Sequence, residues 1–190
     1  MINFEVRAWG ETEIQPRENE LAWKIAEYAV SRPAIDSDVA EMVGCRTVDN
    51  AAVALAAINR KAVSSARAMA LAHLRNHGAT IIGLPSEVTV HAEWAAWANA
   101  CAVRELDFHD TFLASDFGHP GDNIPPLIAV AQQTGRNGFD LVRAIAIAYE
   151  IHVALIKGIS LHRYKKDHVA HLLPATVAGL GALLGLPPEI

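Results

Sequence analysis

The sequence predicts a single all-α domain. Hydrophobic residues make up 52% of its 190 residues and charged residues 19%, which is typical of a globular domain and not of a disordered chain. Alanine dominates the apolar residues, while aromatic residues account for only 6%. Small side chains let helices approach closely, so this composition favours packed helices. Most of the chain also repeats its apolar residues every three or four positions, as amphipathic helices do.

The first half of the chain contains three predicted helices. Residues 1–18 have no periodicity, and we expect them to form an extended lead-in. A helix is predicted over 19–30, stopped by a Ser-Arg-Pro sequence. The next helix, over 37–58, begins at a Ser-Asp pair that can cap it. A third helix is predicted over 61–75, because the following Asn-His-Gly is a common helix end.

The middle of the chain alternates between short irregular pieces and helix. Residues 80–85 predict a short extended piece, after which Ser86 is expected to cap a segment whose small residues concentrate at 92–103. Residues 107–126 are rich in Asp, His, Gly and Pro and lack a helical period, so we expect an ordered loop. A further helix is predicted to begin at about Pro126.

Two long helices are predicted to complete the domain. They cover 140–158 and 167–186, with a kink at Pro174 in the second. Charged and polar residues interrupt the longest apolar stretch, 142–159, so we expect no membrane span. There is no linker, repeat or low-complexity tract, and the prediction is one helical domain over residues 1–190.

Charge, cysteine content and the N-terminal sequence indicate what kind of partner, thiol state and location to expect. The net charge is −5 and no basic stripe is present, so a nucleic-acid partner is not expected. Cys45 and Cys101 have no paired spacing and are interpreted as reduced core thiols. No segment has the layout of a signal peptide, so the expected location is cytoplasmic.

The predicted loop holds the first group of residues that can perform chemistry. Four aspartates and two histidines lie within sixteen residues, between Asp107 and Asp122. Loops held by a rigid scaffold often present reactive side chains. Two alternatives remain open from the residues alone: ordinary turn and cap residues, or a divalent-metal site. No HExxH-like pair or tight Cys/His spacing supports the metal alternative.

A second group of polar residues follows at residues 162–171. His168 and His171 are three residues apart, so they share one face if a helix begins near Asp167. Lys165 and Lys166 lie beside them, and a small polyanion would find both charge and proton carriers here. The alternative is a solvated basic helix end.

Both groups fall within a pattern that resembles the MmgE/PrpD family. The resemblance rests on Ala95-Ala96-Trp97-Ala98-Asn99, on Leu106-Asp107-Phe108-His109-Asp110-Thr111 and on His119-Pro120-Gly121-Asp122-Asn123-Ile124-Pro125-Pro126. It extends over most of the chain from about Asn19. The family contains 2-methylcitrate dehydratases that need no iron–sulfur cluster and related cis-aconitate decarboxylases, and the likeness is greater to the dehydratases.

The resemblance implies a set of site residues. The aspartate, threonine and histidine of the family motifs fall on Asp107, Thr111 and His119, and a later family histidine falls on His168 or His171. We expect His119 to transfer a proton, Asp107 to orient it or act as a base, and Thr111 to hold a carboxylate or the hydroxyl. Substrate binding is expected from Lys165, Lys166 and the helix start after Asn123. No metal or cofactor is expected, and two unpaired cysteines cannot hold an iron–sulfur cluster.

The implied reaction removes water from 2-methylcitrate, a small tricarboxylate, to give 2-methyl-cis-aconitate in propionate breakdown. Two alternatives are a cis-aconitate decarboxylase and a non-catalytic helical remnant that binds or assembles. Family members are usually more than twice this length, add an α+β domain and form homodimers. We therefore expect this chain to correspond to their N-terminal helical portion, without the α+β domain, and to be nearly inactive alone.

Overall fold

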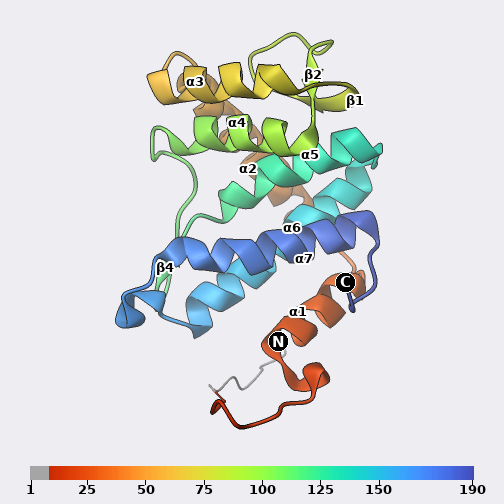
Figure 1. Ribbon diagram of the computed structural model, residues 1–190, viewed down its shortest axis with the longest axis vertical. Coiled ribbons are helices and arrows are strands. Elements are labelled where there is room, and N and C mark those ends of the chain that lie inside the picture. The colour runs from red at the N-terminus through yellow and green to blue at the C-terminus, as the bar shows by residue number, and fades with distance from the viewer. Residues whose placement is uncertain (1–8) are drawn as a thin grey trace.

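The computed structural model describes residues 9–190, and this part of the chain is mostly helical, which confirms the predicted all-α class (Figure 1). Its α-helices are α1 (Leu21–Val30), α2 (Ser37–Ala56), α3 (Lys61–Ala70), α4 (Ala92–Arg104), α5 (Ile124–Thr134), α6 (Gly138–Gly158) and α7 (Leu172–Leu184). Two small antiparallel sheets pair β1 (Leu74–Thr80) with β2 (Thr89–Val90), and β3 (Phe112–Leu113) with β4 (Phe117–Gly118). Short 3-10 helices, labelled η, lie between them.

The helices form a stack in which each packs on its neighbours. In Figure 1, α3, α4, α5, the α6–α7 pair and α1 follow one another from one end of the molecule to the other. The contacts agree, since α3 packs on α4, α4 on α5, α6 on α7, and α7 on α1. The long helix α2 runs behind the stack and contacts both α4 and α6. This packing brings segments that are far apart in the sequence next to one another.

Small residues and branched aliphatic residues build the core. At the centre, Ile124 and Leu127 of α5 pack against Ile145 of α6 and Leu183 of α7, and all four are at most 2% exposed. Each such side chain contributes about 1.5–3 kcal/mol by its burial. Between α3, α4 and β1 the core is lined mainly by alanines, several of them fully buried. The alanine-rich composition therefore does what the sequence analysis expected, because it brings helices close together.

The predicted helix over 61–75 ends early, at Ala70. Residues 71–73 form a 3-10 turn, and the chain then enters β1, which pairs with β2. A Cβ on Gly78 would lie 2.1 Å from the carbonyl oxygen of Val90, so only glycine allows this close strand approach. Strand pairing thus outweighs the local helical preference. The predicted cap at Ser86 is also wrong, because its hydroxyl bonds to Glu87 and α4 begins only at Ala92.

The predicted loop at 107–126 has regular structure within it. It contains the β3–β4 hairpin and the 3-10 helix η3 (Pro120–Asn123). Helix α5 begins at Ile124, before the expected start at Pro126, and places both following prolines in its first turn. Proline is suited to the first turn of a helix, because an N–H at that position would have no acceptor within the helix and its absence therefore costs no hydrogen bond.

The last predicted helix also divides into parts. Asp167 accepts a hydrogen bond from the N–H of Val169 and caps the 3-10 helix η5 (His168–His171), after which α7 begins. Pro174 lies in the first turn of α7, where its missing N–H breaks no interior helical bond, and α7 is continuous through it. The helix changes from 3-10 to α at Leu172, two residues before this proline, and a kink at Pro174 itself stays a prediction.

The first residues of the chain fall partly outside the described structure. The expected lead-in covered 1–18, of which residues 1–8 lie outside the described residues. Residues 9–16 are neither helix nor strand, as expected, and Arg17–Asn19 form a 3-10 turn. Within residues 9–190 no helix is long and apolar enough to cross a membrane.

Two glycines of α7 provide a matched test of the α6–α7 packing. Gly181→Ala should raise the free energy of unfolding by about 0.5–1 kcal/mol, because alanine favours helix and the added Cβ meets nothing within 4 Å. Gly179→Ala gains the same preference, but its Cβ would lie 3.0 Å from the carbonyl oxygen of Ala144. We expect this variant to be less stable than Gly181→Ala by about 1–3 kcal/mol in urea unfolding. Equal stabilities would contradict the close packing.

Candidate active site

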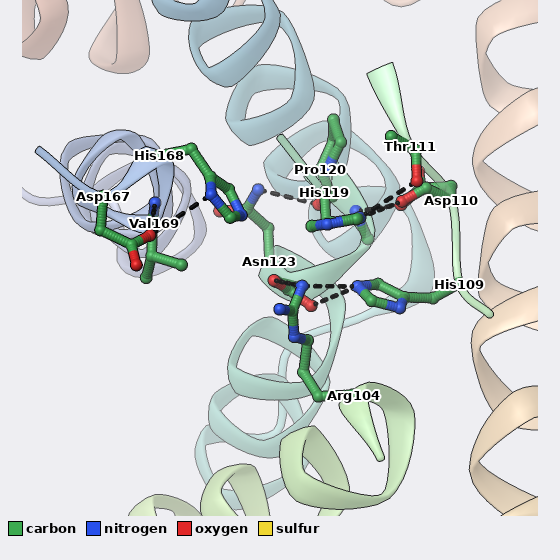
Figure 2. A network of polar contacts seen from close by, with 12 residues as sticks. Arg104, His109, Asp110, Thr111, His119, Pro120, Asn123, Asp167, His168 and Val169 are labelled. Atoms are coloured by element: carbon green, nitrogen blue, oxygen red, sulfur yellow. Dashed lines mark hydrogen bonds and ion pairs between the residues drawn. The ribbon is translucent and has the colours of Figure 1, made fainter. Parts of the chain in front are cut away.

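His119 lies at the end of the β3–β4 hairpin with its ring held from one side. Its Nδ1 is 2.9 Å from the backbone carbonyl oxygen of Asp110 and 3.2 Å from the hydroxyl of Thr111 (Figure 2). A carbonyl can only accept, so the neutral ring carries its proton on Nδ1. Nε2 then keeps its lone pair, which is the state a general base needs.

The turn that carries His119 depends on a glycine. The carboxylate of Asp110 accepts a 2.7 Å hydrogen bond from the N–H of Gly121, and the buried Asn50 of α2 donates to the carbonyl oxygen of Gly121. A Cβ at this position would lie 2.6 Å from Asp110 Oδ1 and 2.9 Å from Asn50 Nδ2. The His-Pro-Gly step is therefore explained by close approach of two anchoring side chains.

A charged group lies beside His119. The buried ring of His109 has its centroid 4.4 Å from that of His119, and its Nε2 lies 3.2 Å from Asp122 Oδ1. Arg104 reaches both partners, with its Nη1 3.0 Å from His109 Nε2 and 3.4 Å from Asp122 Oδ2. A guanidinium N–H can only donate, so His109 Nε2 accepts from Arg104, while Asp122 Oδ1 lies within ion-pair distance of that nitrogen but accepts no hydrogen bond in the described part of the chain. Arg104, Asp122 and His109 thus place paired charge at the edge of the site.

Asn123 is fully buried and joins three elements. Its amide nitrogen donates to the carbonyl oxygen of Pro120 at 2.8 Å and contacts His152 Nδ1 of α6 at 3.2 Å. Its amide oxygen accepts from the hydroxyl of Thr176 of α7 at 2.7 Å. Since His152 Nδ1 accepts, this ring is neutral. The pKa of His152 is lowered from 6.5 to about 4, mainly by burial and in part by its electrostatic interaction with His171, while Asp122 acts in the opposite direction.

This burial changes the expected role of Asn123 in substrate binding. Its side chain is used entirely by protein partners. The helix start that follows it is also a poor anion site, because Pro125 and Pro126 carry no N–H and the N–H of Ile124 bonds to Gly121. The sequence suggested a donor-rich helix end, but the prolines remove the donors.

The two histidines that the sequence could not distinguish have different environments. The ring of His168 makes an edge contact with His119, with centroids 5.5 Å apart, and its Nδ1 lies 3.3 Å from Asp167 (Figure 2). Burial lowers the pKa of His168, and the opposing charge of Asp167 offsets part of this effect. His171 is buried and its Nε2 lies 3.0 Å from the carbonyl oxygen of Ile159. His168 therefore faces His119, whereas His171 ties η5 to the end of α6.

Three other expected site residues lie at the surface. Asp107 is exposed, has a φ of +50°, and its carboxylate makes no hydrogen bond or ion pair with any residue in the described part of the chain. It therefore does not orient His119, a position filled by Asp110 and Thr111. Lys165 and Lys166 are exposed in the turn before η5, close to His168 in the chain.

Several buried nitrogen atoms in this cluster have no hydrogen-bond partner. They are Nδ1 of His109, Nε2 of His152 and Nε2 of His168. A groove of about 420 Å³ is lined by Asp122 and Thr176 together with Trp97, Val169 and Leu173, but by none of these three histidines. Among residues 9–190, no three His, Cys, Asp or Glu side chains are arranged to hold a metal ion. The arrangement suits proton transfer at the imidazoles.

Sequence reasoning missed several members of this cluster. Arg104 and His152 lie within segments whose apolar periodicity predicts helix, and that periodicity carries no signal for a polar role. His109 and Asp110 belong to the same motif as Asp107, but the choice among them depended on which face of the loop turns inward. The backbone of Asp107 has a left-handed conformation, and this conformation affects which side chains of the loop point inward. The local sequence gives no clear signal for that conformation.

Comparisons with known proteins agree with the motifs. Residues 19–190 match the model of the MmgE/PrpD N-terminal domain. A 2-methylcitrate dehydratase of Escherichia coli (strain K12) is 32% identical over 105 residues, which is 50% of this chain and 22% of that protein. A probable 2-methylcitrate dehydratase of Saccharomyces cerevisiae is 25% identical over 193 residues, covering 94% of this chain and 37% of that protein. A mitochondrial 2-methylcitrate dehydratase of Yarrowia lipolytica is 33% identical over 98 residues, 46% of this chain and 19% of that protein. The matched part thus spans about a fifth to just over a third of these relatives.

The lowered pKa of His152 predicts a pH dependence of stability. Between pH 6.5 and about 4 the unfolded chain binds a proton at this histidine that the folded chain does not, so the free energy of unfolding falls as the pH falls. The full loss from this group is at most about 3 kcal/mol. His152→Asn keeps an acceptor for Asn123 and removes the titration, so its stability should change less across this window in urea unfolding. His77→Asn, at an exposed position, should retain the dependence of the parent. Identical pH profiles for the parent and His152→Asn would contradict this account.

Proposed function

Because this chain belongs to the MmgE/PrpD family, we propose that it provides the proton-transfer face of a hydro-lyase that dehydrates 2-methylcitrate to 2-methyl-cis-aconitate. The observation that carries the proposal is the state of His119. Its Nδ1–H is committed to Asp110, and its Nε2 is left as a base beside a second imidazole, His168. The names of the relatives supply the substrate.

The reaction sets three chemical requirements. A base must remove a carbon-bound proton next to a carboxylate, an acid must protonate the departing hydroxyl, and cations must offset the charge of three carboxylates. A proton next to a carboxylate is weakly acidic, since negative charge develops beside existing negative charge. Positive charge placed in advance around the substrate is therefore as important as the base itself.

The residues divide among these requirements as follows. His119 takes the carbon proton at Nε2, and the resulting imidazolium is stabilised by the carbonyl oxygen of Asp110. His168, in edge contact with His119, is the second proton carrier. Thr111 touches the same ring and can also hold a substrate carboxylate or hydroxyl. Asp107 as a second base remains a prediction.

Positive charge comes from two sides of the site. Lys165 and Lys166 are exposed beside His168, and Arg104 lies beside His109, where Asp122 balances its charge. This set is modest for a tricarboxylate. We therefore propose that this chain alone binds the substrate weakly and turns it over slowly, and that efficient catalysis needs charge from further residues of the kind the longer relatives possess.

The wider setting follows from the same proposal. Dehydration of 2-methylcitrate is a step of propionate catabolism. We also propose that the enzyme works as a homodimer and that neither a nucleic acid nor a membrane is its partner. We propose a cytoplasmic location for this chain, while the relative of Yarrowia lipolytica is named as mitochondrial.

The substrate assignment predicts selective binding. The purified chain should bind 2-methylcitrate in calorimetric titration and bind succinate, a dicarboxylate, more weakly. Dehydration, followed by the absorbance of the new double bond, should be at least about a hundredfold slower per site than for the Escherichia coli dehydratase. Comparable turnover would contradict the incomplete charge set. Carbon dioxide release from cis-aconitate would instead identify a decarboxylase, and a chain that binds no tricarboxylate would be a non-catalytic module.

The role of His119 predicts the outcome of its removal. In any polypeptide that contains this domain and dehydrates 2-methylcitrate, His119→Ala should lower kcat by about a hundredfold or more, because it removes the base. His77→Ala, at an exposed histidine outside the site, should leave kcat unchanged. Near-normal turnover of the His119 variant would leave this residue only a structural role.

A further inference from the structure

Asp110 uses three separate acceptors to hold the His119 turn. Its backbone carbonyl oxygen accepts from His119 Nδ1 at 2.9 Å, and its Oδ1 accepts from the N–H of Gly121 at 2.7 Å. Its Oδ2 accepts from the phenol of Tyr149 at 2.9 Å. The first two bonds lie within the same loop, so they fix its internal shape. The third joins the loop to helix α6, thirty-nine residues away in the chain.

Tyr149 is suited to be a permanent donor. Its ring packs against the central core formed by α2, α5, α6 and α7, so its position is set by rigid helices. Burial raises the pKa of Tyr149, the charge and hydrogen bond of Asp110 raise it further, and Arg46 opposes only in part. The phenol therefore stays protonated across the physiological range and donates to Asp110 throughout.

The remaining anchors of the turn do not replace this bond. Asn50 holds the carbonyl oxygen of Gly121, two residues past the histidine, and Thr111 belongs to the same loop as Asp110. The carboxylate of Asp110 has two partners in the described structure, Gly121 and Tyr149, and only Tyr149 lies on a core helix. Without the phenol, the carboxylate that shapes the loop is tied to nothing outside it.

We propose that Tyr149 is a positioning residue that acts through Asp110 to keep His119 in its Nδ1-protonated tautomer with Nε2 directed at the substrate. The inference rests on the proposed role of His119 as the base. Tyr149 does not touch the substrate in this proposal. Its effect is on the orientation and the protonation site of an imidazole that it does not contact.

The tautomer of His119 can be measured directly in the chain. Nuclear magnetic resonance of isotope-labelled histidine distinguishes Nδ1–H from Nε2–H rings, and His119→Gln identifies the resonances of this residue. The parent should show neutral His119 as the Nδ1–H tautomer. Tyr149→Phe, which removes only the phenol oxygen, should shift His119 towards the Nε2–H form. Tyr28→Phe is the matched control, since it removes a phenol–carboxylate contact between α1 and Glu150 of the same helix and should leave His119 unchanged.

Each result decides the inference. If the parent chain shows a predominantly Nε2–H ring at His119, the inference is overturned without any variant. The inference can therefore be tested even if Tyr149→Phe fails to fold. An unchanged tautomer in folded Tyr149→Phe would also overturn it, as would an equal shift in Tyr28→Phe. An unchanged tautomer in folded Tyr149→Phe would overturn only the positioning role, because the readout is a tautomer and not turnover, whereas an Nε2–H ring in the parent would also remove the base that the proposed dehydration needs. A failed tricarboxylate assay would overturn the proposed function but leave the effect of Tyr149 on the His119 tautomer measurable.

Discussion

The site is organised around one fully buried amide. Asn123 is 0% exposed, and burying an amide without partners costs several times the net gain of a hydrogen bond. Its partners come from the turn after His119, from His152 on α6 and from Thr176 on α7. The amide of Asn123 makes all of its hydrogen bonds only when the turn, α6 and α7 are packed together. Formation of the turn is therefore coupled to docking of the last two helices.

Small residues make this convergence possible. A Cβ on Gly118 would lie 2.7 Å from the Cδ1 of Ile156 and 3.2 Å from His152 Nε2, so glycine at this position lets the hairpin approach α6 without displacing either side chain. Gly121 has the same function against Asp110 and Asn50. Polar anchors and close backbone approach thus require each other, since the hydrogen bonds reach only where no side chain intervenes.

The same geometry separates roles among similar side chains. His152 and His171 are buried and bonded within the scaffold, whereas His119 and His168 have their rings together. Asp110 and Asp122 hold protein groups, whereas Asp107 points to solvent. In the sequence these acids and imidazoles look interchangeable, but the structure uses most of them as scaffold and leaves one partly buried pair of imidazoles, His119 and His168, in edge contact. The proposed chemistry depends on that pair and on cations gathered around it.

The sequence by itself determined the helical class, most helix boundaries, the motif and the chemical types of the site, because these follow from local periodicity and from residues close in the chain. It also placed Thr111 and His119 together, and the structure joins them by a 3.2 Å contact. Tertiary structure decided what the sequence could not: that residues 74–80 are strand, that His168 and not His171 faces His119, and that Asp110 takes the orienting position expected of Asp107. The physical reason is that each of these outcomes depends on a partner far away in the chain. Strand β1 needs β2 and a glycine at the crossing, His171 needs the carbonyl oxygen of Ile159, and Asp110 needs Tyr149 on α6.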